Sequence, residues 1–99
     1  MEGEITDKLR EIYRKAGEEG IWIREWLPET EGLYMASAGS LAEVKMLERA
    51  VGKEIDLEKL TLAELYQISI LGTGKTREEA CLNAIKFYKG FKKGLNQSN

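Results

Sequence analysis

Residues 66–80 read YQISILGTGKTREEA and predict a strand, a tight turn and the start of a helix. Apolar and polar side chains alternate over the first five positions, which is the period of a strand. Gly72 and Gly74 free the backbone for a turn. Thr76 stands three residues before Glu79, the spacing of a helix capping box. This stretch therefore predicts that a strand leads directly into a C-terminal helix.

The helix that follows has an apolar face and a basic face. At helical spacing, the apolar face consists of Ala80, Cys81, Ala84, Ile85, Tyr88 and Phe91. The lysines lie mostly on the other side or near the end, at positions 86, 89, 92 and 93. We expect the apolar face to pack on a sheet and the polar tail, residues 96–99, to fray.

Residues upstream predict a helix followed by a hairpin. The first helix is amphipathic, with an apolar stripe at Ile5, Leu9, Ile12, Tyr13 and Ala16. Gly17 and Gly20 are expected to end it in left-handed conformations. Residues 21–27 and 33–38 are rich in strand-forming residues, and turn residues lie between them. A helix and two antiparallel strands are therefore expected.

The faces of this hairpin depend on its register. If Leu27 pairs with Leu33, the side chains of Trp22, Arg24, Trp26 and Tyr34 share one face with Ala36 and Ala38. Tryptophan, tyrosine and arginine are enriched at binding hot spots. We therefore single out Trp22, Arg24, Trp26 and Tyr34 as candidate partner-binding residues, with burial in the core as the alternative.

The segment between the hairpin and residue 66 predicts further helices. Ser40 and Glu43 form a capping box for a helix that Gly52 can stop. Asp56 can cap a short turn, and Thr61 with a glutamate at position 64 forms another capping box. That second box could start a helix as far as residue 70, but the alternation in residues 66–70 favours a short helix followed by a strand.

These elements give an α+β fold in a single small domain spanning residues 1–99. The expected order is α-β-β-α-α-β-α, with about three antiparallel strands packed by three to four helices. A domain of 99 residues has a modest core, and short chains often bury a second apolar face against a copy of themselves. A homo-oligomer is therefore expected.

Composition limits the possible classes of protein. The chain is 42% apolar and 32% charged, which is typical of a folded soluble protein. It has no apolar run long enough for a membrane span and no signal-peptide pattern at its start, so we expect a cytoplasmic protein without membrane contacts. The only cysteine, Cys81, cannot form an internal disulfide. Residues 65–99 carry six basic and two acidic residues, so the C-terminal third is basic.

Several enzyme classes are excluded by residue content. The chain has no histidine, which excludes Ser-His and Cys-His nucleophile pairs and histidine-based zinc sites. Cys81 is interpreted as a small buried residue. Glu25 stands among apolar strand residues, where burial can raise its pKa, but a single carboxylate is weak support for acid-base catalysis. We therefore expect no catalytic residues, no cofactor and no metal, and hence no enzyme.

The glycine-containing turn also carries an anion-binding pattern. Residues 69–76 approach a phosphate-binding P-loop, with a serine in place of its first glycine. Only 23 residues follow, too few for the remaining strands and the metal-holding aspartate of a nucleotide hydrolase. The turn residues and the helix N-terminus can still attract a small anion or nucleotide. The candidate ligand residues are Gly74, Lys75, Thr76 and Arg77.

Two local resemblances bear on function, and both lie within residues 66–88. Residues 72–84, GTGKTREEACLNA, resemble the final strand-to-helix passage of double-stranded RNA-binding domains, and the element order agrees if residues 40–64 are an insertion. That resemblance implies phosphate contacts from the last helix. The basic residues for such a nucleic-acid interface are Lys75, Arg77, Lys86, Lys89 and Lys93.

The run Thr-Arg-Glu-Glu-Ala at residues 76–80 is also similar to HicB-like antitoxins and small phage accessory proteins. This resemblance implies a regulatory or inhibitory role without catalysis. The function expected from the sequence is therefore a non-catalytic binding protein whose target is a protein or a small anionic ligand. A double-stranded nucleic-acid-binding module is the alternative, and a nucleotide-hydrolysing enzyme is a distant third.

Overall fold

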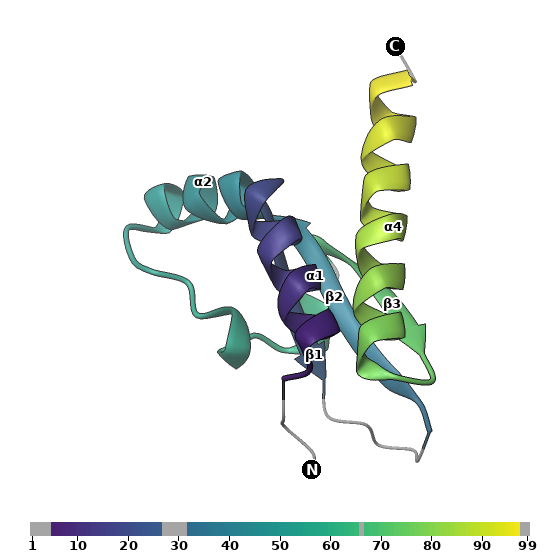
Figure 1. Cartoon of the computed structure of the whole chain (residues 1–99). Coiled ribbons are helices and arrows are strands. Elements are labelled where there is room, and N and C mark those ends of the chain that lie inside the picture. The colour runs from purple at the N-terminus through teal and green to yellow at the C-terminus, as the bar shows by residue number, and fades with distance from the viewer. Residues whose placement is uncertain (1–4, 27–31, 66, 98–99) are drawn as a thin grey trace.

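A computed structural model describes residues 5–26, 32–65 and 67–97, and its element order confirms the expected α+β fold. The helices are α1 (Asp7–Glu18), α2 (Leu41–Val51), α3 (Leu62–Leu65) and α4 (Arg77–Gln97), with a short 3-10 helix, η1, at Leu57–Lys59. The strands are β1 (Ile21–Trp26), β2 (Tyr34–Ser40) and β3 (Ser69–Gly74) (Figure 1). The order is α-β-β-α-α-β-α, as the sequence predicts.

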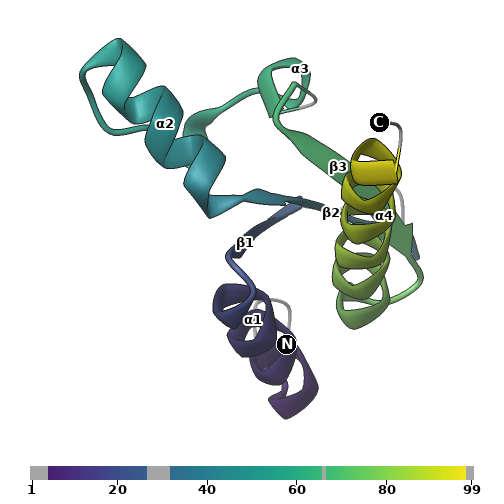
Figure 2. The same ribbon diagram turned by 90° about the horizontal axis from the view of Figure 1, so that it is seen from above.

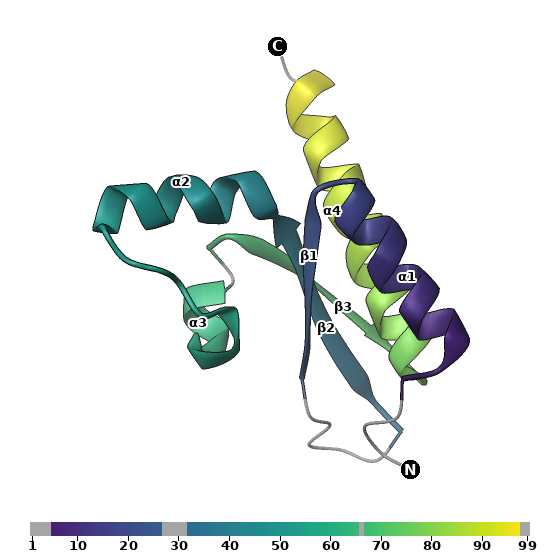
Figure 3. The same cartoon turned by 60° about the vertical axis from the view of Figure 1, so that its left-hand side comes forward.

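The three strands form one antiparallel sheet in the order β1-β2-β3. Helices α1 and α4 cover one face, which we call the helical face, while the segment with α3 lies over the other, which we call the crossover face (Figure 3). The core on the helical face is built from Leu9, Ile12, Ala16, Ile21, Ala36, Ala38, Ala80, Cys81 and Ala84. A smaller cluster on the crossover face is built around Trp22, Val44 and Leu65.

Helix α1 confirms the amphipathic pattern but ends later than expected. Thr6 caps its start, accepting a hydrogen bond from the Leu9 amide at 3.0 Å. Gly17 lies inside the helix, which continues to Glu18, so the expectation that Gly17 ends it is wrong. Gly20 alone of the pair has a left-handed backbone, with φ 74°. One such residue is enough to turn the chain into β1.

The hairpin register differs from the expected one by a single position. Ile21 pairs with Ser40 and Trp26 with Met35, whereas pairing Leu27 with Leu33 would shift every partner by one. Leu27 and residues 28–31 lie outside the described residues. Because side chains alternate between faces, this shift moves Tyr34 to the helical face, opposite Trp22 and Trp26. The prediction that Tyr34 shares a face with the tryptophans is therefore wrong.

Gly72 and Gly74 serve packing rather than chain reversal. Neither has a positive φ, and both lie within β3. A Cβ atom on Gly72 would lie 2.2 Å from the Ala84 nitrogen, and one on Gly74 would lie 2.7 Å from the Ala80 nitrogen. The two glycines therefore let α4 approach the sheet more closely than any side chain would permit. The chain turns at residues 75 and 76 instead.

In the crossover segment Ser40 caps α2 and the predicted capping box of Thr61 and Glu64 forms. The Ser40 hydroxyl accepts a hydrogen bond from the Glu43 amide at 3.2 Å, and Gly52 ends α2 with φ 77°. Thr61 and Glu64 cap α3 reciprocally, at 3.2 and 2.9 Å. A short helix followed by a strand is therefore confirmed.

Strand β3 starts at Ser69, later than the alternating pattern suggests. The Ile68 amide donates to the Leu65 carbonyl at 3.0 Å, so Ile68 belongs to the turn that ends α3. Tyr66, where the pattern begins, lies outside the described residues. Among the described residues, no helix combines the length and apolar character that crossing a membrane requires.

Candidate functional site

A cluster of hydrogen-bonded polar side chains joins three elements on the helical face. The Glu25 carboxylate of β1 accepts hydrogen bonds from Arg77 Nε at 2.7 Å and Arg77 Nη2 at 3.0 Å. It also accepts one from the Tyr13 hydroxyl of α1. Arg77 is the first residue of α4. This cluster ties α1, β1 and α4 together.

The electrostatics of the cluster favour a stable ion pair over proton transfer. Partial burial raises the pKa of Glu25, but the hydrogen bonds from Arg77 and Tyr13 outweigh it, so the pKa lies below its ordinary value. Burial, together with the hydrogen bond to Glu25, raises the pKa of Tyr13. A general base would need a Glu25 pKa near neutrality. The cluster is therefore suited to holding the fold together.

Cys81 lies beneath this cluster and is fully buried. Burial, followed by the nearby charge of Glu25, raises the pKa of its thiol to about 12. A nucleophilic cysteine needs the opposite shift, because the thiolate is the reactive form. The position suits the interpretation of Cys81 as a small core residue.

The candidate anion site at the start of α4 is largely engaged by the chain itself. Thr76 caps the helix by accepting a hydrogen bond from the Glu79 amide at 3.1 Å. Arg77 turns inward to Glu25. The Glu78 carboxylate accepts a hydrogen bond from the Thr6 hydroxyl at 2.7 Å. That bond and one from its own backbone amide lower the pKa of Glu78.

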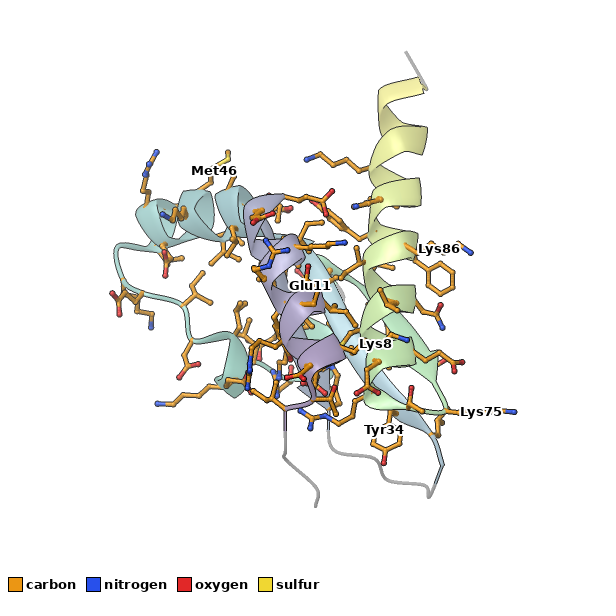
Figure 4. All side chains as sticks on the ribbon, in the orientation of Figure 1. Lys8, Glu11, Tyr34, Met46, Lys75 and Lys86 are labelled. Carbon is orange, nitrogen blue, oxygen red and sulfur yellow. The ribbon has the colours of Figure 1, made fainter. Side chains whose placement is uncertain are left out.

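An anion approaching the first turn of α4 would therefore meet a carboxylate. Gly74 packs beneath the helix, and of the four predicted ligand residues only Lys75 has its charge directed to solvent (Figure 4). The four residues are adjacent in the sequence, but their polar groups do not point to a common site. This geometry lends little support to a phosphate cradle.

The candidate partner-binding residues of the hairpin are divided between two faces. Trp22 is only 5% exposed and packs into the crossover cluster, so it is a core residue. Tyr34 packs against the core of the helical face. Trp26 is partly buried and donates a hydrogen bond from Nε1 to the Ser37 hydroxyl at 3.0 Å.

Arg24 holds the crossover segment in place. Its side chain is 12% exposed, and Nη1 donates to the backbone carbonyls of Leu57 and Leu60, each at 2.6 Å. The guanidinium carbon lies 3.9 Å from the centre of the Trp26 ring. Arg24 and Trp26 are therefore occupied by contacts within the chain. Of the four hairpin candidates, none is left as an exposed aromatic or cationic anchor.

The lysines of the nucleic-acid alternative do not gather on one surface. Lys89 forms an ion pair with Glu19 of α1 at 2.7 Å, and Lys86 points outward on the side of α4 that faces away from α1 (Figure 4). The side chain of Lys93 lies outside the described part. With Arg77 bound to Glu25, Lys75 and Lys86 are the two remaining exposed cations of that set.

A hollow that the sequence did not reveal lies between α2, the start of β3 and the second half of α4. We call it the α2–α4 hollow, and it is lined by Glu43, Gln67, Ile68, Ser69, Ile70, Tyr88 and Phe91. Helix α2 and the end of α4 extend past the sheet in different directions (Figures 1 and 2). Phe91 remains 55% exposed on the rim.

A length mismatch exposes this part of α4. The helix has 21 residues and β3 has 6. At ordinary rises per residue the helix is about 31 Å long and the strand about 20 Å. The apolar face of α4 therefore continues beyond the sheet that covers its first half. Comparing the two lengths in the sequence would have signalled that Phe91 lacks a sheet partner.

No protein-family model, curated protein or solved structure matches this chain.

Proposed function

We propose that this chain is a non-catalytic binding protein that takes an apolar segment of another protein into the α2–α4 hollow. The observation that carries the proposal is the position of Phe91, a large apolar side chain half exposed above Ile68 and Ile70. Exposed aromatic side chains beside an apolar floor are the usual anchors of protein recognition.

The lining of the hollow favours an apolar protein segment over a small anion. Its one charged residue is Glu43, and none of the lining residues is basic. Gln67 adds an amide that can hydrogen-bond to a bound backbone, and the Ser69 hydroxyl, which donates to the Leu65 carbonyl, can still accept a hydrogen bond. An anionic ligand would be repelled by Glu43 and would find no cation within the lining.

This kind of binding supports a regulatory or inhibitory role. The ionisable groups that are candidates for chemistry, Glu25 and Cys81, are paired or buried inside the domain. A protein whose candidate reactive groups, within the described residues, are paired or buried can still act on its partner by occupying a surface. We therefore propose that the chain regulates its partner through occupancy alone.

A nucleic-acid-binding module remains a second candidate because of one topological observation. Without residues 41–68 the chain reads helix, three antiparallel strands, helix, with both helices on one face of the sheet. This is the order that the resemblance to double-stranded RNA-binding domains implies. The acidic first turn of α4, with Glu78 and Glu79, opposes phosphate contacts at that point.

The test is site-specific photocrosslinking in the cells that produce the protein. A photoreactive phenylalanine analogue at position 91 should crosslink to a discrete protein partner. The same analogue at Met46, which is exposed on α2 but does not line the hollow, should not. The variant Phe91→Ala should reduce copurification of that partner at least about tenfold, as expected for loss of an aromatic anchor.

Equal crosslinking from both positions, or none from position 91, would overturn the proposal. Binding of double-stranded RNA that weakens log-linearly with salt and is unaffected by Phe91→Ala would favour the second candidate.

A further inference from the structure

Strand β3 is an edge strand of the sheet. It pairs with β2 on one side and, among the described residues, has no strand on the other. Its residues 69–74 read SILGTG, without a charge or a proline. The opposite edge strand, β1, carries Arg24 and Glu25. Proteins usually guard free edges with charged residues or proline, because exposed backbone groups pair readily with another strand.

Helix α4 provides a matching surface beside this edge. The Asn83 amide nitrogen donates to the Thr73 carbonyl of β3 at 2.7 Å, so Asn83 marks the side of α4 that leans over the strand and already occupies one acceptor of its edge. A carbonyl oxygen has two lone pairs, so Thr73 can accept a second hydrogen bond. Phe87, one helical turn later on the same side, is 50% exposed. Gly90 follows in open space, with nothing within 4 Å of the position a Cβ would occupy.

This side of α4 carries one acidic and one basic residue, so the two would face each other if a second copy of the helix ran antiparallel beside the first. Glu79 lies before Asn83 and Lys86 after it, and both are exposed. Within the described part of the chain, neither side chain forms an ion pair. Lys86 points outward, away from α1 (Figure 4). In an antiparallel copy of the helix the acid and the base exchange places.

We propose that a second copy of this chain pairs with the free edge of β3 to form a two-fold symmetric dimer. A two-fold axis perpendicular to the sheet, beside the free edge and level with the middle of β3, makes the two β3 strands antiparallel and continues the sheet from one copy into the other. Both α4 helices then lie on the same face and run antiparallel, with Phe87 packed between them.

The position of the axis follows from the packing of α4 on β3. Gly72, near the middle of β3, lies under Ala80 and Ala84. The axis is therefore level with the midpoint of these two helical residues. Glu79 and Lys86 stand on either side of that point at nearly equal separations, so each Glu79 meets Lys86 of the second copy. The interface is self-complementary in both backbone hydrogen bonding and charge.

The dimer interface and the α2–α4 hollow share Ser69 and Ile70 of β3, but Phe91 is outside the interface and neither Glu79 nor Lys86 lines the hollow, so the two proposals can fail separately. Dimer formation is measured by the mass of the particle, whereas partner binding is measured by crosslinking from position 91. The test uses the full chain, with native mass spectrometry and analytical ultracentrifugation. The wild type is expected to be a dimer.

Charge reversal identifies the interface. Glu79→Lys or Lys86→Glu alone places like charges opposite each other and should weaken dimerisation at least about tenfold. The double variant should restore it. A mixture of the two single variants should form mainly the mixed dimer, because every facing pair is then complementary. Lys92→Glu, an exposed control on the same helix, should leave dimerisation unchanged, and circular dichroism should show that all variants keep the fold.

A monomeric wild type would overturn the proposal. So would a dimer that responds equally to Lys92→Glu and Lys86→Glu, or single variants that fail to pair preferentially with each other.

Discussion

Glu25 and Arg77, 52 positions apart in the chain, form a bidentate ion pair on the helical face of the sheet. The carboxylate projects from β1, and the guanidinium comes from the first residue of α4. Tyr13 adds a third hydrogen bond from α1. The pair therefore fixes the start of α4 on the sheet.

Replacing Glu25 with Gln should destabilise the fold. The change removes the carboxylate charge next to the partly buried Arg77 guanidinium and weakens the hydrogen bonds between the two side chains. Hydrogen bonds to charged groups contribute about 1.5 to 3 kcal/mol each, and the two side chains are 20% and 26% exposed, so we expect a loss of about 2 kcal/mol at pH 7. Urea denaturation measures this free energy of unfolding. Glu54→Gln, at an exposed position, is the control.

The same pair predicts how stability depends on pH. The pKa of Glu25 lies below its ordinary value of 4.5 in the folded protein. Its contribution is therefore complete above that ordinary pKa and is lost as pH falls through the folded value. The stability difference between wild type and Glu25→Gln should be constant from neutral pH down to about 5 and shrink below it. A difference that grew on acidification would contradict the ion pair.

Local sequence signals specified most of the fold, but not the register of its hairpin. The N-cap at Ser40 and the capping box at Thr61 depend on residues three apart, so they can be read from the sequence and are present in the structure. The register depends on which residues the loop between β1 and β2 leaves unpaired. A difference of one position places Tyr34 on the opposite face from Trp22. For this reason the predicted aromatic site does not exist as a single surface.

Gly72→Ala should be among the most damaging small substitutions in the chain. The new methyl group would lie 2.2 Å from the Ala84 nitrogen and 2.6 Å from its Cα atom, and these backbone atoms cannot move without shifting α4. Overpacking of this kind costs about 3 kcal/mol. Thermal and urea unfolding of the purified variant measure the loss.

Gly17→Ala is the matched change for Gly72→Ala and should have the opposite effect. Gly17 lies inside α1, has no positive φ and has nothing within 4 Å of the position that a new methyl group would occupy. Alanine is favoured over glycine in a helix interior by about 0.5 to 1 kcal/mol. A gain in stability of that size is expected. A loss would mean that α1 ends at Gly17, as the sequence alone had suggested.

Cys81 should react slowly with thiol reagents in the native protein. It is fully buried, and burial raises the pKa of its thiol to about 12. At pH 8 the thiolate fraction is therefore far below that of an exposed cysteine, whose pKa is about 8.5. Labelling with a disulfide reagent should be at least about 100-fold slower in buffer than in denaturant. Rapid labelling of the native state would exclude the packing of α4 described above.

The α2–α4 hollow could not be predicted, because it lies where the apolar stripe of α4 continues beyond the sheet that covers its first half. Phe91 continues the apolar stripe of Ala84 and Tyr88, so the sequence assigns all three to the core. The sheet covers Ala84 but not Phe91, which is half exposed. Periodicity reports which side of a helix is apolar and not how much of its length finds a partner.

Replacing Arg24 with Met should loosen the crossover segment while leaving the rest of the sheet intact. The change removes two hydrogen bonds to the carbonyls of Leu57 and Leu60 and the contact with the Trp26 ring. Methionine retains much of the apolar length of the side chain, so packing on β1 is largely kept. Hydrogen exchange should therefore accelerate on residues 55–65, while α4 and β3 keep their protection. The emission of Trp26 should change as its stacked cation is lost. Lys45→Met, an exposed change on α2, is the control, and uniform acceleration across the whole chain would show that Arg24 stabilises the domain globally rather than fastening this segment.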